Sequence, residues 1–401
     1  MKSWTLIASY LWKDTWSRWL EQPSSVLSRV FVGSLMVTVA TVILVAFNLL
    51  ERNLRTRLEN FGVNTIISRE MVINSDPAAL PNQPRADIFK PLDQYGEKLR
   101  LRQFYIRARK LAPSQVLRVA LPVKAGLTPE EFEAFKGEVD RRFGPDTQAL
   151  ALAWTMPFEV ACNSITGALA LGFDPGLCVD TTRSCRPSTP SPYFNARGFR
   201  PYTDFKLRPS MLLAAADVDS AKRLIQRGVK ADHSLGLRGA PPAQAYFTVT
   251  NDKARSVRAP LYPPSRLMRA AGVAIHVEKT QALENVDRVI LYETGATRVG
   301  KLDTIGWLPG ALADHLTSFG GRLDGKGGQM SALEWITSGA TASYGTVSEP
   351  CAHPQKFPHP QVLLLNYVQG STAIEAYWKS VAWPLQGVFI GEPLAAPFAR
   401  P

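Results

Sequence analysis

Three residues in the last third of the sequence have side chains that could carry out nucleophilic chemistry. Asp314 and His315 are adjacent, and Ser318 follows three residues later. A serine becomes a nucleophile when a base lies within hydrogen-bond reach and a third group orients that base. Neighbouring side chains on an extended strand point to opposite faces, so these three residues could act together only if the backbone bends. One hypothesis is a peptidase-like hydrolase; the other, which the strand geometry favours, is that Asp314 and His315 only fix the loop before Gly320.

Other polar residues also stand where apolar runs stop. In an open α/β sheet, the loops that face a ligand lie at the carboxyl ends of the strands. We therefore expect binding residues at four further positions, which are Asp252, Glu293, Glu349 and His353.

The same polar positions include imidazole and carboxylate groups, which are the ligands of many divalent metals. Their spacing matches no metal-ligand motif, so no metal site is predicted. The sequence also lacks Gly-x-Gly-x-x-Gly, P-loop, Gly-x-Ser-x-Gly and His-Glu-x-x-His motifs, and no cofactor is predicted.

The chain has four cysteines, at 162, 178, 185 and 351. Cys178 and Cys185 stand seven residues apart in a loop rich in Gly, Asp, Thr and Ser, without the Cys-x-x-Cys spacing of zinc sites. An even number of cysteines with one close pair indicates disulfides in an oxidising compartment. We expect a Cys178–Cys185 bridge and a pairing of Cys162 with Cys351.

The first hundred residues predict a membrane anchor. Segment 1–29 is an amphipathic, interfacial segment whose apolar positions, at spacings of three to five, are Trp4, Ile7, Leu11, Trp12, Trp16 and Trp19. Residues 30–50 contain no charged residue and are long enough, at about 1.5 Å per residue, to cross a hydrocarbon core of about 30 Å as a transmembrane helix. Because no cleavage pattern of small residues follows, the helix is predicted to remain as an anchor. Segment 51–97 is a juxtamembrane segment that continues into a proline-rich linker.

The charge pattern indicates where the protein works. The chain of 401 residues has 46 Lys and Arg against 34 Asp and Glu, a net charge of +12, and its basic residues form no run interleaved with aromatics. Nucleic-acid binding is therefore not expected, whereas a basic surface facing a lipid bilayer is. The basic residues around the span lean towards an amino terminus inside, which with the cysteines predicts a single-pass protein of the bacterial inner membrane whose main domain is periplasmic.

Residues 98–401 are predicted to form an α/β domain with a mainly parallel sheet flanked by helices. Short apolar strands alternate with helical segments, as in βαβ units. Thr128 and Glu131 have the spacing of a capping box with Pro129 at the first helical position, and Phe132 is expected on the buried face of the helix that follows. The expected strands are 115–122, 149–154, 211–215, 243–250, 273–277, 288–292, 340–344 and 388–390. The expected helices are 164–171, one from Asp217 or Asp219 to Gly228, 263–271, 329–338, 362–368 and 372–383.

Long motifs in the last third carry a resemblance to a bacterial family. They are Pro-Gly-Ala-Leu-Ala-Asp-His-Leu-Thr-Ser-Phe-Gly-Gly at 309–321, Gly-Ala-Thr-Ala-Ser-Tyr-Gly-Thr-Val-Ser-Glu-Pro-Cys at 339–351 and Glu-Ala-Tyr-Trp-Lys-Ser-Val at 375–381. From about 98 to 398 the sequence resembles an uncharacterised family whose members co-occur with exosortase, the membrane enzyme proposed to sort PEP-CTERM proteins. The resemblance implies an accessory of protein sorting in the cell envelope, with no established activity.

Two further resemblances concern the fold and the anchor. The strands around 289–295 and 313–320, with Gly339-Ala340 and Gly391-Glu392-Pro393, resemble caspase-like peptidases of the gingipain and clostripain type. In that family a catalytic His ends the first of these strands and a Cys the second, whereas here Thr294 replaces the His and 313–320 contains no Cys. Residues 1–70, which end in Leu-Glu-Asn-Phe-Gly-Val-Asn-Thr-Ile-Ile-Ser at 58–68, resemble the start of MacB-type ABC transporter permeases. This last resemblance implies, as a third possibility, a membrane partner of an ABC-type transporter.

Overall fold

A computed structural model describes residues 66–70, 101–179, 184–237 and 239–400. All of them belong to one compact unit, Asn60–Pro401. The predicted interfacial segment 1–29 and transmembrane helix 30–50 lie outside the described residues. Among the helices of the described part, none is both long and apolar enough to span a bilayer.

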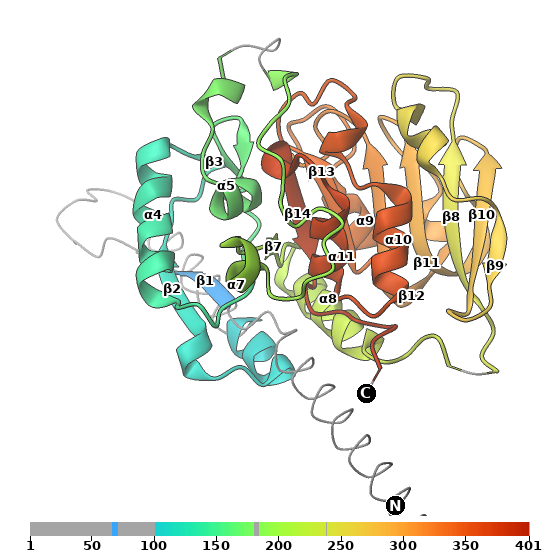
Figure 1. Ribbon diagram of the computed structural model, residues 1–401, viewed down its shortest axis with the longest axis horizontal. Helices are drawn as coiled ribbons and strands as arrows, with labels where there is room; N and C mark the ends of the chain where they lie inside the picture. The colour runs from blue at the N-terminus through green and yellow to red at the C-terminus, as the bar shows by residue number, and fades with distance from the viewer. Residues whose placement is uncertain (1–65, 71–100, 180–183, 238, 401) are drawn as a thin grey trace, which may run out of the picture. The chain divides into compact units, whose positions relative to one another are not determined.

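Eleven strands form one sheet flanked by helices, so the domain is a mixed α/β fold (Figure 1). The spatial order is β2-β1-β4-β7-β14-β13-β12-β11-β8-β10-β9. The bounds along the chain are β1 Ile66–Glu70, β2 Val116–Ala120, β4 Leu150–Ala153, β7 Ser210–Leu212, β8 Ala243–Val249, β9 Arg266–Met268, β10 Val273–Lys279, β11 Val286–Gly295, β12 Ile305–Leu316, β13 Ala342–Thr346 and β14 Gly387–Gly391. Strand β1 lies inside segment 51–97, so the sheet begins before residue 98.

The sheet consists of two parallel blocks that run in opposite directions. The pairings within β2-β1-β4-β7-β14 are parallel, as are those within β13-β12-β11-β8-β10. Strands β13 and β14 pair antiparallel, and they join the two blocks. The carboxyl ends of β4 and β7 therefore lie at the opposite edge of the sheet from the carboxyl ends of β11 and β12.

Two helices begin at a predicted cap, Thr128 or Asp217, and others begin at caps that the sequence analysis did not predict. Thr128 caps α4 (Pro129–Arg142) and exchanges hydrogen bonds with Glu131 in a capping box, while Ser164 caps α5 (Ile165–Leu171). Capping boxes also begin α9 (Ala332–Ser338) and α11 (Ala373–Ser380). The remaining bounds are α7 Pro201–Phe205, α8 Val218–Ala231 and α10 Pro360–Val368; residues 101–109 are also helical. Helices α10 and α11 pack side by side in front of the sheet in Figure 1.

Two local predictions are wrong. Segment 263–271 is not a helix, because Arg266–Met268 pairs antiparallel with β10 as the edge strand β9. Helix α8 begins at the predicted cap Asp217 but continues past Gly228 to Ala231. Gly228 does not end the helix; it leaves room for a neighbour, since a Cβ there would lie 2.3 Å from the Glu392 carboxylate.

The core on one face of the sheet is aromatic. The ring of Trp378, on α11, stacks on that of Phe389, on β14, with 4.5 Å between centroids. Tyr344, on β13, meets Phe389 edge-on at 5.0 Å. All three side chains are fully buried, which fixes α11 against the junction of the two blocks.

The disulfides differ from the predicted pairing. The bridges are Cys162–Cys178 and Cys185–Cys351, so both the Cys178–Cys185 and the Cys162–Cys351 predictions are wrong. Cys162 lies in the turn between two short strands, β5 (Glu159–Val160) and β6 (Asn163–Ser164), which pair with each other and, through β5, with β3 (Gly126–Leu127).

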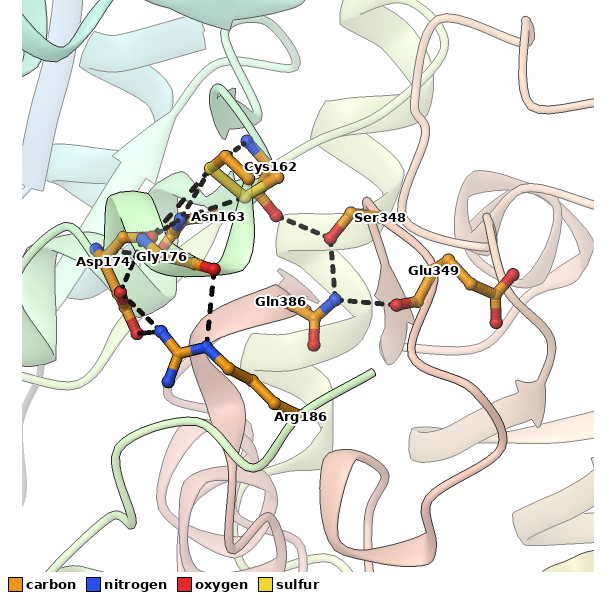
Figure 2. Close-up of a disulfide and its surroundings, with 9 residues drawn as sticks. Cys162, Asn163, Asp174, Gly176, Arg186, Ser348, Glu349 and Gln386 are labelled. Atoms are coloured by element: carbon orange, nitrogen blue, oxygen red, sulfur yellow. Dashed lines mark hydrogen bonds and ion pairs between the residues drawn. A yellow bond between two sulfur atoms is a disulfide. The ribbon is translucent and has the colours of Figure 1, made fainter. Parts of the chain in front are cut away.

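Contacts distant in sequence decide this pairing. The Asn163 side chain donates to the Asp174 carbonyl and accepts from the Asp174 amide, which brings Cys178 next to Cys162 (Figure 2). The loop that begins after α5 is thus tied to the β5–β6 turn at Cys178 and to the segment after β13 at Cys185.

Candidate functional site at the carboxyl ends of β11 and β12

The predicted catalytic residues lie at the carboxyl end of β12, beside the end of β11. In the parallel register of the two strands, Glu293 pairs with Asp314 and Thr294 with His315. All four residues have an exposed fraction of 0%. The structure therefore brings the predicted residues Glu293 and Asp314 side by side, inside the protein.

An arginine enters between these two carboxylates. Arg258 belongs to the 3₁₀ helix Ser256–Leu261 and is itself fully buried. Its Nη2 lies 2.7 Å from Oδ1 of Asp314, and its Nη1 lies 3.3 Å from Oε2 of Glu293. The guanidinium also donates to the carbonyls of Thr294 and Pro358, at 3.0 and 3.1 Å. Arg258 thus holds together two strand ends and the segment before α10.

The charges of this cluster balance only if one carboxyl group is protonated. Burial, followed by the negative charge of Asp314, raises the pKa of Glu293 well above its ordinary value. Burial also raises the pKa of Asp314, although Arg258 opposes that shift. A neutral Glu293 beside an Asp314–Arg258 ion pair leaves no net charge in the interior.

The segment that carries Arg258 lies across the end of β11. A Cβ on Gly295 would lie 2.0 Å from the carbonyl oxygen of Arg255, so the backbone can approach this closely only because residue 295 is glycine. Arg255 Nε donates to Oγ1 of Thr317 at 3.2 Å, just beyond β12. Asp252 Oδ2 pairs with Arg255 Nη1 at 2.8 Å, and Oδ1 accepts from its amide. We call residues 252–258 the arginine plug; the predicted binding residue Asp252 is the residue that fixes it.

His315 is held by a tryptophan. Its Nδ1 accepts a hydrogen bond of 2.9 Å from Nε1 of Trp335, on α9. Burial lowers the pKa of His315 to about 3, so the ring is neutral at physiological pH.

Ser318 lies beyond the strand and is half-buried. Its carbonyl accepts from Thr346 Oγ1 at 2.9 Å. Within the described ranges, no hydrogen bond joins the side chains of Asp314, His315 and Ser318, since Asp314 faces Arg258 and His315 faces Trp335. A catalytic role for the three residues stays a prediction.

The last two predicted binding residues belong to the loop that carries Cys351. Oε1 of Glu349 accepts from the Cys351 amide at 2.7 Å, and the Glu349 carbonyl accepts from Gln386 Nε2 at 2.9 Å. Figure 2 shows this chain of contacts continuing through Ser348 to the carbonyl of Cys162. His353 meets Trp383 edge-on at 6.0 Å. Glu349 and His353 thus hold the loop that carries Cys351 in place.

Sequence reasoning missed Arg255 and Arg258. The available signal was a pair of arginines three residues apart directly after the strand that ends at 250. In the part of the chain that the structure describes, no group of three or more His, Cys, Asp or Glu side chains could hold a metal ion.

Comparison with known proteins gives one structural similarity. The chain is similar to the crystal structure of the Arg-specific cysteine proteinase gingipain R, with a TM-score of 0.42 and 10% sequence identity over 84% of this chain and 78% of that one. No protein-family model matches the sequence, and no curated protein matches it.

Proposed function

We propose that this chain is a single-pass protein of the bacterial inner membrane whose disulfide-bonded α/β domain lies in the periplasm. There it serves as a non-catalytic accessory of exosortase-linked protein sorting. The span is residues 30–50, and the lipid bilayer is its first partner. The domain is a caspase-like scaffold whose function is binding.

The observation that carries the proposal is the pair of disulfides. Disulfides persist in oxidising compartments and are rare in the bacterial cytosol. All four cysteines of the chain are paired, and the bridges close loops of very different length, with sequence separations of 16 and 166. Together with the charge-free run at 30–50, they support an anchored domain on the outer side of the inner membrane.

The arginine plug supports the non-catalytic part of the proposal. An acid or base must reach the atom whose proton it transfers. Asp314 and His315 have no exposed surface, and each already uses its side chain on another residue, Arg258 or Trp335.

Thiol labelling in cells tests the location. The full chain is expressed in a Gram-negative host, precipitated with acid and treated with a maleimide polymer with and without prior reduction. We expect no mass shift before reduction and four additions after it. Labelling of all four cysteines without reduction would contradict a periplasmic domain. Deleting residues 30–50 supplies the control, because the chain that lacks the span should remain in the cytosol with reduced cysteines.

A second experiment separates the accessory from the hydrolase. Ser318→Ala, at a half-buried position, is assayed for processing and surface display of envelope proteins in the native host. An accessory keeps its function in this variant, whereas a peptidase using Ser318 loses it. Co-purification of full-length chain with exosortase supports the sorting role; co-purification with an ABC-type ATPase, lost on deleting residues 1–60, supports a transporter partner instead.

A further inference from the structure

A hollow of about 290 Å³ lies at the amino ends of strands in the second parallel block, at the opposite edge of the sheet from the arginine plug. Its walls come from the last turn of α8 and the segment after it, from the start of β8, and from the first halves of β11 and β12. The lining residues used below are Lys230, Leu235, Leu237, Ala240, Arg288 and Leu308.

An irregularity in β11 places Arg288 in this lining. The pairing of β11 with β12 shifts register between Val286 and Val289, and Arg288 lies inside the shift with a φ of 58°. A positive φ is unfavourable for a residue with a Cβ, and a bulge re-aims the side chains of its strand. Nε and Nη2 of Arg288 then donate to the carbonyls of Pro242 and Pro241, at 3.2 and 2.7 Å. The guanidinium is thereby fixed beside the start of β8.

The positive charge at the hollow is not neutralised within the described part of the chain. Among the described residues that line the hollow, none is Asp or Glu. The bonds of Arg288 go to neutral carbonyls, and its Nη1 has no partner among the described residues. Lys230 is exposed and has no hydrogen bond or ion pair to them either. An anion in the hollow would therefore form charge-assisted hydrogen bonds that no group of the described chain already occupies.

The carboxylates nearest to these cations in the sequence are directed to other partners. Asp232, directly after α8, pairs with Arg109 and accepts from the amide of Ala396 at 3.1 Å. Asp287 lies against the backbone of β12, since a Cβ on Gly306 would lie 2.2 Å from its Oδ1. Neither carboxylate belongs to the lining of the hollow, so neither competes there with a bound anion.

Leucine side chains supply an apolar part of the lining. Leu235 and Leu308 are half-buried, and Leu237 is 55% exposed. Ligand sites typically combine such apolar walls with a few polar groups that orient the ligand. A hollow of about 290 Å³ is at the lower end of the volumes of ligand pockets, so its occupant is small.

We propose that this hollow binds a small organic carboxylate with an apolar chain, of the size of a short fatty acid. The carboxylate pairs with Lys230 and with the remaining N–H groups of Arg288, and the chain packs on the leucines of the lining. This inference is independent of the membrane anchor and of the sorting role.

Calorimetry on the full chain in lipid nanodiscs tests the site with three probes, and empty nanodiscs supply the blank for partition into lipid. The probes are hexanoate, hexanamide, which lacks the charge, and acetate, which lacks most of the chain. We expect saturable binding of hexanoate and a loss of about tenfold or more for each of the others, because one loses the charge-assisted contacts and the other the apolar burial. Equal affinity for all three probes, or no saturable binding of hexanoate, overturns the proposal.

Removing one charge tests the role of the cations. Lys230→Met keeps the length of an exposed side chain and removes its charge, so it should weaken hexanoate about tenfold and leave hexanamide unchanged. The matched control is Lys222→Met, on the same helix but outside the lining, where Lys222 pairs with Asp219. Hexanoate should bind this control as it binds the wild type. Equal losses of affinity in the two variants would contradict a carboxylate site at Lys230.

Filling the hollow locates the binding independently of charge. Ala240→Trp, at an exposed position in the lining, should abolish hexanoate binding. The matched control is Ala216→Trp, at an exposed alanine in a separate hollow of about 230 Å³ at the carboxyl ends of β4 and β7. Loss of binding in Ala216→Trp with retention in Ala240→Trp would place the ligand elsewhere and overturn the assignment.

Discussion

The two edges of this sheet differ in the surroundings of their charged residues. At the carboxyl ends of β11 and β12, Glu293, Asp314 and Arg258 have no exposed surface and neutralise one another. At the carboxyl ends of β4 and β7, Arg102 and Asp217 face a hollow of about 230 Å³. Equivalent positions of an α/β sheet thus enclose an ion-pair cluster at one edge and border a hollow at the other.

The difference teaches that titratable residues at strand ends do not by themselves make a site. What decides is whether the next loop turns back over the strand ends. The loop after β8 does so and places Arg258 among the carboxylates. The loop after β7 leads directly into α8, whose cap residue Asp217 remains in solvent.

The largest expected effect is the loss of the buried cation. Arg258→Met should lower the free energy of unfolding by about 3–5 kcal/mol, because it leaves the buried Asp314 carboxylate without its counter-charge. Denaturant titration measures the change. Arg298→Met removes an exposed ion pair with Glu334, whose side chains are 63% and 44% exposed, and should cost less than about 1 kcal/mol. Equal losses in the two variants would show that the plug contributes no more than a surface pair.

The next largest loss of stability is expected from adding a side chain at Gly295, at the end of β11. Gly295→Ala should destabilise the domain by about 1–3 kcal/mol, since the new methyl group must displace the Arg255 backbone. Gly300→Ala is the control, because a Cβ there meets nothing within 4 Å. If thermal unfolding midpoints of the two variants coincide, the plug does not lie against Gly295 in solution.

A pH dependence of similar size is expected from His315. Its pKa is about 3 in the folded protein against an ordinary 6.5, so the unfolded chain binds the proton more tightly. The stabilisation that His315 provides is full above pH 6.5 and is lost as the pH falls from there towards 3. Between pH 7 and 5 the wild type should lose roughly 2 kcal/mol more than His315→Gln. Identical pH profiles of unfolding for the two proteins would mean that the ring is open to water.

The smallest change in stability is expected at the carboxyl ends of β4 and β7. Ala216→Trp should change the free energy of unfolding by less than about 0.5 kcal/mol, because residue 216 is exposed. Denaturant titration beside Gly295→Ala makes the comparison direct. A loss as large as that of Gly295→Ala would mean that the loop after β7 is packed like the plug.

Local signals in the sequence predicted the starts of α4 and α8. The capping box at Thr128 and Glu131 involves residues three apart, and the spacing of Phe132, Phe135 and Val139 places all three on the buried face of α4. Such interactions are complete within one helical turn or two, so they can be read without knowing the rest of the fold. The alternation of strands and helices gave the α/β class for the same reason.

The tertiary structure alone decided the pairings between distant residues. Cys185 bonds to Cys351 across a sequence separation of 166, and Arg258 pairs with Asp314 from a different loop. Strand β14 pairs antiparallel with β13, so the two parallel blocks run in opposite directions. Each of these contacts depends on how several elements pack together, and residue types or spacing along the chain do not encode that packing locally. The chemistry of the strand ends was therefore visible in the sequence, while its enclosure by the arginine plug was not.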